Sequence, residues 1–232
     1  SDLIKYAVEK EPLGTGGAIR NAAKELAGDA QVVIFNGDVL SSHSLESQLE
    51  MHKNTNADVT LHLTPVDDAR AYGCVPTDEA GRVTAFLEKM DNPVTNTINA
   101  GCYVFDKSVI AAIPEHEVVS VERQTFPDLI TKNKKVMGYI EKAYWLDIGT
   151  PNALMKGSRD LVSGDADADA LDMYKFSHRD NNFVSLSEKI SGEFVGGSAI
   201  GAHCTLTDCQ IDGSIISDGV ESENCIIKNS FI

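Results

Sequence analysis

Basic residues, aromatic residues and long apolar runs are all scarce in this sequence. There are 20 Lys and Arg against 35 Asp and Glu, a formal net charge of −15. Nucleic acids and anionic membranes attract clustered Lys and Arg, so this balance excludes a general binder of either. No stretch approaches the roughly 20 apolar residues that cross a bilayer, and no apolar stretch follows a basic N-terminus. We expect neither membrane insertion nor secretion.

Cysteines are also few, and their spacing matches no metal or disulfide pattern. The five cysteines are an odd number without a CxxC pair or a His-Cys ligand spacing. They are typical of reduced thiols in a cytoplasmic protein. Hydrophobic residues at 42% and charged residues at 24% are ordinary for a folded protein, so we expect a packed core.

Short apolar runs alternate with amphipathic stretches from Gln31 to Ile148, which predicts an α/β domain. A buried strand is expected at residues 32–35, ending at Asn36-Gly37-Asp38, and Ser44 can cap the helix that follows. Thr150 before Pro151 predicts another helix, to about Leu161, because Pro at the first helical position loses no hydrogen bond. Further strands are expected at residues 58–63, 83–87, 98–105, 136–140 and 144–147.

The pattern changes after this helix. Small, acidic and polar residues from Ser163 to Asn182 predict a linker. Beyond it, isolated aliphatic residues recur six apart, as in Ile200 and Leu206 or in Val220, Ile226 and Ile232, although Ile211 and Ile216 fall out of register. A six-residue period predicts a parallel β-helix. We expect its uncapped end either to pack on a partner, as in a homo-oligomer, or to be truncated. The expected domains are residues 1–162, a linker at 163–189, and the β-helix at 190–232.

Six short motifs occur in one order along the α/β region. Together they resemble the sugar-1-phosphate nucleotidyltransferases, over about Leu3 to Leu161, and the C-terminal repeats are similar to an appendage on many members. The resemblance implies a Rossmann-like domain with a mixed central sheet, followed by a short left-handed parallel β-helix. Each motif alone is weak evidence, but six in order are specific. The motifs are Leu13-Gly14-Thr15-Gly16-Gly17-Ala18, Asn36-Gly37-Asp38, Tyr72-Gly73, Phe86-Leu87-Glu88-Lys89, Asn99-Ala100-Gly101 and Trp145-Leu146-Asp147-Ile148-Gly149-Thr150-Pro151.

Asp38 and Asp147 each end an expected strand, where ligands of open α/β sheets gather. The resemblance implies that this pair is catalytic and holds Mg²⁺, a cation that prefers carboxylate and phosphate oxygens. The alternative is that Asp38 is only a turn residue and that Asp147 merely neighbours a helix cap.

The glycine motif predicts a flexible loop that opens on a helix near Ala18 and lets the backbone approach a ligand. The resemblance implies that this loop, Leu13, Gly14, Thr15, Gly16 and Gly17, binds the nucleobase and ribose, with Asp38 also binding the nucleotide. An ordinary glycine turn is the alternative.

The resemblance places the sugar-phosphate site at Gly73, Glu88, Lys89 and Asn99. Lys89 would bind the phosphate as a catalytic residue, because its ammonium group is a compact positive charge. Glu88 and Asn99 suit sugar hydroxyls. Met90 stands where the family often has proline, which leaves the charged pair in place. Glu88-Lys89 could instead be a solvated strand end.

The resemblance implies transfer of a nucleotidyl group from a nucleoside triphosphate to a sugar 1-phosphate, with release of pyrophosphate. It favours GTP and mannose 1-phosphate; the alternatives are glucose-1-phosphate uridylyl, thymidylyl or adenylyl transfer, or a non-catalytic regulatory paralogue. Both expected partners are small molecules. Family members begin with a strand and a glycine-rich loop bearing an Arg and a Lys. No such segment precedes Ser1, so we expect the chain to begin after it and, as given, to be incomplete for catalysis.

Overall fold

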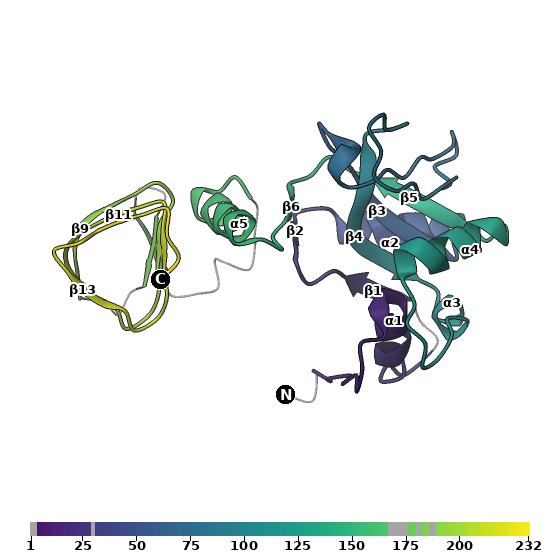
Figure 1. Ribbon diagram of the computed structural model, residues 1–232, viewed down its shortest axis with the longest axis horizontal. Helices are drawn as coiled ribbons and strands as arrows, with labels where there is room; N and C mark the ends of the chain where they lie inside the picture. The colour runs from purple at the N-terminus through teal and green to yellow at the C-terminus, as the bar shows by residue number, and fades with distance from the viewer. Residues whose placement is uncertain (1–3, 29–30, 167–175, 180–181, 186–188) are drawn as a thin grey trace. The chain divides into compact units, whose positions relative to one another are not determined.

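A computed structural model describes residues 4–28, 31–166, 176–179, 182–185 and 189–232 (Figure 1). The chain forms two compact units: Ser1–Gly37 with His43–Lys142, and Asp38–Ser42 with Ala143–Ile232. This grouping differs from the expected domains, whose boundaries at 162 and 189 stay a prediction. No helix in the described part is long and apolar enough to cross a membrane.

A four-stranded sheet of order β1-β4-β3-β5 forms the centre of the first unit. β4 runs antiparallel to β1 and β3, while β3 and β5 are parallel, so the sheet is mixed. This confirms the expected α/β class. The strands are β1 (Val32–Phe35), β3 (Val59–Pro65), β4 (Thr97–Phe105) and β5 (Val136–Ile140).

Helices of this unit follow local capping signals. Ser44 Oγ accepts the Ser47 N–H at 3.2 Å, which satisfies a free donor at the start of α2 as predicted. α2 packs on β3, β4 and β5, and α4 packs on β5. The helices are α1 (Gly14–Ala23), α2 (Leu45–Thr55), α3 (Lys107–Ala111) and α4 (Phe126–Thr131), with short turns η1 (Ala69–Ala71) and η2 (Val121–Thr125).

β3 is buried on both faces, and the two faces differ in polarity. Leu61 and Leu63 join the apolar core, together with Phe105 and Phe126. The alternate positions are polar: Thr60 Oγ1 lies 2.9 Å from Nδ1 of His52 on α2. A polar layer therefore separates α2 from the sheet.

The expected strand at residues 83–87 is not formed. Val83 donates its N–H to Val136 O at 2.9 Å, whereas Leu87 donates to Cys74 O at 3.0 Å. Because the partner changes within four residues, only isolated bridges result.

The second unit begins with an antiparallel pair, β2 (Val39–Ser41) and β6 (Trp145–Asp147). Helix α5 (Pro151–Ser163) follows, and Thr150 Oγ1 accepts the Ala153 N–H at 3.2 Å, as predicted. Gly157 lets α5 lie close to this pair, since a Cβ there would be 3.4 Å from Leu146 Cδ2.

Short parallel strands complete the unit. β10 pairs with β8 and β12, and β11 pairs with β9, β13 and β14, consistent with the expected β-helix. β7 and β8 lie inside the expected linker, so β-structure begins before residue 190; residues 167–175 of that linker lie outside the described residues. The strands are β7 (Phe176–Arg179), β8 (Asn182–Ser185), β9 (Lys189–Val195), β10 (Ala199–Ile200), β11 (Thr205–Asp212), β12 (Ile215–Ile216), β13 (Glu221–Glu223) and β14 (Ile226–Lys228).

The strand register corrects the six-residue period. Most partners on adjacent turns are sixteen residues apart, as in Ala199 with Ile215, and the turns look three-sided in Figure 1. Corners carry residues of positive φ, including His203, Asp208 and Gly213. Sides of unequal length therefore replace a strict repeat of six.

The same register decides which aliphatic residues are buried. Ile211 and Ile216, which break the six-residue pattern, are 0% and 1% exposed, whereas Ile226, which fits it, is 69% exposed. Ile227, the next residue, packs against the buried cluster instead, because it pairs with Ile211. The interior follows the three-sided turn.

Candidate functional site

The glycine motif lies in the first turns of a helix. α1 begins at Gly14, four residues before the expected start at Ala18, so the motif is not a flexible loop. Gly16 donates its N–H to Val119 O at 2.8 Å, and Leu13 O accepts the Val119 N–H at 2.9 Å. The segment at Val119 therefore satisfies donors that the start of a helix leaves free.

Close packing explains part of this motif without a ligand. A Cβ on Gly14 would lie 2.6 Å from Val119 O, one on Gly16 2.8 Å from Val119 Cγ1, and one on Gly17 2.8 Å from Glu117 O. Such distances leave no room for a side chain. Gly16 and Gly17 are buried accordingly.

Gly14 and Thr15 are the exposed part of the motif. Thr15 Oγ1 accepts the Val121 N–H and donates to Glu122 Oε2, both at 2.9 Å. These bonds tie α1 to η2 and fix the start of the helix. A rigid, exposed backbone at Gly14 and Thr15 is the surface that this motif offers to a ligand.

Three expected sugar-phosphate residues lie together. Gly73 has a φ of 76°, and a Cβ there would be 2.5 Å from Leu87 O and 3.5 Å from Lys89 N. Cys74 and Leu87 exchange backbone hydrogen bonds at 3.1 and 3.0 Å. The turn at Gly73 thus sets the position of Glu88 and Lys89, whose side chains are exposed.

Glu88 has a partner that the motifs do not indicate. Its Oε1 lies 3.1 Å from Arg123 Nε, and both side chains are largely exposed. An exposed ion pair of this kind is worth about 0–1 kcal/mol, so a ligand can displace it at small cost.

Asn99 lies on β4, two residues beyond Thr97, which bonds to the Val75 backbone. Its Nδ2 donates to the Tyr103 hydroxyl at 2.8 Å, and its Oδ1 accepts the Gly101 N–H at 3.1 Å. Burial raises the pKa of Tyr103, so the phenol stays protonated. The amide is held rigidly, at a half-buried position of β4.

Asp38 and Asp147 lie close together, as expected, although 109 positions separate them. β2 and β6 pair Val39 with Asp147, and Ile148 donates its N–H to Asp38 O at 2.8 Å. A Cβ on Gly149 would lie 3.0 Å from Asp147 Oδ1 and 3.5 Å from Asp38 Oδ2. Both carboxylates therefore lie beside Gly149. Because glycine has no side chain, the space next to the two carboxylates stays open.

The donor set of this pair suits a hard cation such as magnesium. In the described part of the chain, no three His, Cys, Asp or Glu side chains gather as a metal site. Magnesium in nucleotide enzymes is commonly held by one or two carboxylates together with substrate phosphates. Asp147 Oδ1 already accepts the Gly149 N–H at 2.9 Å, which orients that carboxylate.

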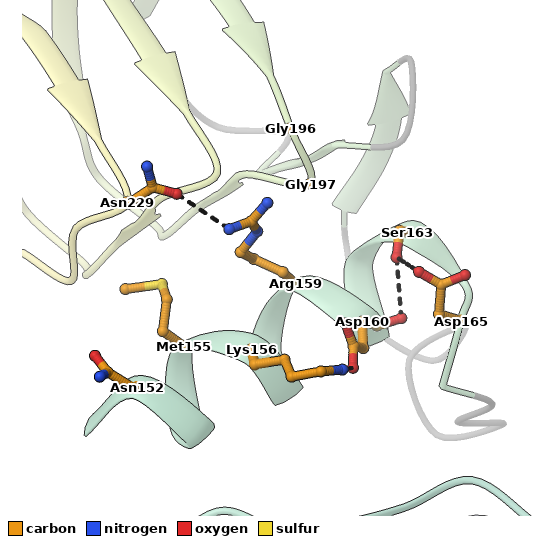
Figure 2. Close-up of a pocket in the computed structure, with 10 residues that line it drawn as sticks. All are labelled: Asn152, Met155, Lys156, Arg159, Asp160, Ser163, Asp165, Gly196, Gly197 and Asn229. Atoms are coloured by element: carbon orange, nitrogen blue, oxygen red, sulfur yellow. Dashed lines mark hydrogen bonds and ion pairs between the residues drawn. The ribbon is translucent and has the colours of Figure 1, made fainter. Parts of the chain in front are cut away.

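A cavity of about 760 Å³ lies in the second unit, between α5 and the parallel strands (Figure 2). Arg159 reaches across it and donates from Nη1 to Asn229 Oδ1 at 3.1 Å. Its guanidinium carbon would be 3.0 Å from a Cβ at Gly213. Asn229 and Gly213 are sixteen residues apart, so Arg159 lies along one corner of successive turns. No motif identified this contact.

Arg123, Tyr103 and Arg159 were missed because no short pattern contains them. Arg123 is 35 positions from Glu88 and lies in η2, a segment with no family signature. Tyr103 looks like an ordinary strand residue, because aromatic residues are common in strands. Only the long-range pairing of the sheet and turns brings these residues to their partners.

The comparisons with known proteins agree with this arrangement. A family model described as "Nucleotidyl transferase" matches residues 3–164. The chain is 46% identical, over 97% of its length, to a mannose-1-phosphate guanylyltransferase of Mycobacterium tuberculosis, of which it covers 63%. It is 39% identical, over 68% of its length, to a D-glycero-alpha-D-manno-heptose 1-phosphate guanylyltransferase of Aneurinibacillus thermoaerophilus, of which it covers 67%.

A solved structure is also similar. HddC from Yersinia pseudotuberculosis, complexed with GMP-PN, superposes with a TM-score of 0.55 at 31% identity, over 64% of this chain and 62% of that one. The chain spans less than two thirds of the Mycobacterium relative. Family match, sequence identity and fold agree, and the chain belongs to the nucleotidyl transferase family.

Proposed function

We propose that the protein transfers a guanylyl group from GTP to mannose 1-phosphate, giving a GDP-sugar and pyrophosphate. The observation that carries this proposal is the 46% identity to a mannose-1-phosphate guanylyltransferase over nearly the whole chain. The Aneurinibacillus relative is also named a guanylyltransferase, and its named acceptor is a manno-heptose 1-phosphate. Both relatives are therefore named for guanylyl transfer to the 1-phosphate of a manno-configured sugar.

In this proposal Asp38 and Asp147 hold Mg²⁺. The support is their placement on both sides of Gly149, with carboxylate oxygens that suit a hard cation. When bound, the ion would neutralise charge on phosphate oxygens during the transfer. The protein's own part is to fix the two carboxylates, through the β2–β6 pairing and the Gly149 N–H.

Lys89 binds the phosphate of the acceptor, and Glu88 and Asn99 bind sugar hydroxyls. An oxygen of the sugar phosphate attacks the α-phosphorus of GTP; the new P–O bond forms as the bond to pyrophosphate breaks. The attacking oxygen already carries negative charge, so no general base is required. Positioning and charge compensation supply the acceleration.

The nucleotide binds at the glycine motif, where Gly14 and Thr15 present their exposed backbone. Gly16 and Gly17 serve this site indirectly, because their packing on residues 117–119 fixes the start of α1. Leu13 is half-buried and can meet the flat face of a base.

Binding and turnover of the full-length protein with a matrix of triphosphates and sugar phosphates test the proposal. We expect GTP with mannose 1-phosphate to give the highest kcat/KM for pyrophosphate release. Preference for UTP, dTTP or ATP with glucose 1-phosphate would assign another specificity within the family. Tight binding of both substrates without turnover under any pairing would instead indicate a regulatory paralogue.

We further propose that the C-terminal turns form a left-handed β-helix through which the protein self-associates, and that it works in the cytoplasm. The support for self-association is exposed apolar surface on the strands of these turns, where Ile226 is 69% and Val195 37% exposed. Deletion of residues 191–232 should lower the mass measured by light scattering. An unchanged mass would contradict self-association through this segment.

A further inference from the structure

Two cysteines lie against each other inside the parallel strands of the second unit. Cys209 belongs to β11, and Cys225 immediately precedes β14, sixteen residues later. β11 and β14 pair Gln210 with Ile226, which makes the two cysteines neighbours on adjacent turns. Their sulfur atoms are 3.1 Å apart.

The backbone at this point suits a disulfide. Gln210 donates its N–H to Cys225 O at 2.8 Å, so the two strands are in normal hydrogen-bonding contact. Neighbouring strands lie about 4.8 Å apart, within the range of roughly 4.4–6.8 Å between the Cα atoms of disulfide-linked cysteines. Only a movement of about 1 Å by the sulfur atoms separates the reduced pair from a bond of about 2.05 Å.

The other cysteines have different surroundings. Cys204 Sγ lies in the same cluster but contacts Ser217 O at 3.1 Å. Cys102 Sγ contacts Gln48 Oε1 at 3.4 Å in the first unit, which also holds Cys74. The pair at positions 209 and 225 is therefore distinguished by direct contact between sulfurs.

The two members of the pair differ in access. Cys225 is half-buried, whereas Cys209 is 1% exposed. Ser222 Oγ donates to Cys225 Sγ at 3.1 Å. Burial raises the pKa of the Cys209 thiol. An oxidant from solvent meets Cys225 first, and Cys209 is placed to react second.

We propose that Cys209 and Cys225 form an oxidisable pair that links successive turns of the parallel strands. A peroxide transfers one oxygen atom to the sulfur of Cys225, which becomes a sulfenic acid. The peroxide is reduced to water or an alcohol. Cys209 then attacks that sulfur, the S–S bond forms, and the sulfenic oxygen leaves as water. Two thiols are oxidised, the peroxide is reduced, and a reducing thiol reverses the link. The link would hold the last described turn to the one before it.

Mass spectrometry of the native protein tests this proposal. Treatment with hydrogen peroxide, followed by alkylation of free thiols, should leave Cys209 and Cys225 unalkylated and the intact chain lighter by two hydrogens before alkylation. Cleavage after Glu221 and Glu223 separates Cys225 from Cys204 and Cys209, whereas trypsin would keep all three in one peptide. Fragmentation of the linked peptides between residues 204 and 209 then shows which of these two cysteines is bonded to Cys225. Dithiothreitol should restore alkylation at both.

Matched variants sharpen the result. Cys204→Ser should still form the link, while Cys225→Ser should abolish it and leave Cys209 alkylated. The oxidised protein should unfold at a higher temperature than the reduced one, because a cross-link restricts the unfolded chain. Oxidation of Cys225 to a sulfinic or sulfonic acid without a disulfide would overturn the proposal, as would a disulfide between Cys225 and Cys204. The measurement on the wild-type protein tests the proposal even if a variant fails to fold.

Discussion

Acid should destabilise the first unit through His62, an imidazole buried between α2 and the sheet. Its side chain is fully buried, and neither ring nitrogen has a side-chain or backbone hydrogen-bond partner in the part of the chain that the structure describes. The ring stacks on His43, with centroids 3.9 Å apart and an interplanar angle of 15°. Burial, and secondly the nearby His43, lower the pKa of His62 to about 3.

The sign and size of the effect follow from linkage. The unfolded chain binds a proton at His62 near pH 6.5, whereas the folded chain does so only near pH 3. The unfolded state therefore binds more protons between these values. The stabilising contribution is present above pH 6.5 and is lost as the pH falls toward 3. Each unit in this window costs about 1.4 kcal/mol, so the free energy of unfolding should fall by about 2 kcal/mol between pH 7 and pH 5.

The groups packed around His62 also affect how the free energy of unfolding depends on pH. Burial also lowers the pKa of His43, so it adds to the same acid sensitivity. Tyr139 on β5 lies beside His62, with ring centroids 6.3 Å apart, and its hydroxyl donates to Glu141 Oε2 at 3.0 Å. Gln48 on α2 bonds to His43 at 3.0 Å. Glu141 is the one carboxylate among these neighbours, and it is already bonded to Tyr139.

Urea unfolding at pH 7 and pH 5 measures the effect. His62→Leu should remove about 2 kcal/mol of the difference between the two pH values, because an apolar side chain of similar size needs no proton. His116→Gln is the matched control, since His116 is 84% exposed. An equal pH dependence in wild type and His62→Leu would refute the reasoning. If the variant does not fold, the imidazole NMR signals of wild-type His62 should still show no protonation down to pH 5.

Two other substitutions test the site. Gly16→Ala should destabilise the protein by about 1–3 kcal/mol in thermal unfolding, because its Cβ would overlap Val119, whereas Gly37→Ala has free space and should be nearly neutral. Asp147→Asn should lower kcat by at least about 10²-fold, because an amide is a poorer magnesium ligand than a carboxylate. The melting temperature should stay close to that of wild type, since the two side chains have the same size. Unchanged turnover would show that Asp147 is not a metal ligand.

Local signals predicted the elements of the α/β region well. The caps at Ser44 and Thr150, and the strands leading to Asp38 and Asp147, depend on neighbouring residues, which the sequence displays directly. Signals of this kind fail where backbone partners change, as at residues 83–87. They also cannot show that Arg123 reaches Glu88, because that pair depends on how distant segments pack.

The predicted six-residue period of the C-terminal segment was wrong for a different reason. A count of aliphatic residues found the six-residue side between Ile200 and Leu206 and extended it to the whole segment. The true turn has sixteen residues, and its next sides bring Ile211 and Ile216 inward. The corner residues of positive φ were the better signal, because Asp208 recurs as Asn224 and Gly213 as Asn229, each sixteen residues later.

The glycine motif shows why resemblance and packing must be weighed residue by residue. One short signal, Gly14 to Gly17, resembles a nucleotide loop, yet all three of its glycines are explained by the approach of residues 117–119. Gly16 and Gly17 would be required for folding even in a relative that had lost its substrate. Gly14 carries the same requirement although it is exposed, because its φ is 68° and a Cβ there would lie 2.6 Å from Val119 O. Packing thus accounts for all three glycines, so their presence alone is no evidence of ligand binding, which must be tested at the exposed backbone of Gly14 and Thr15.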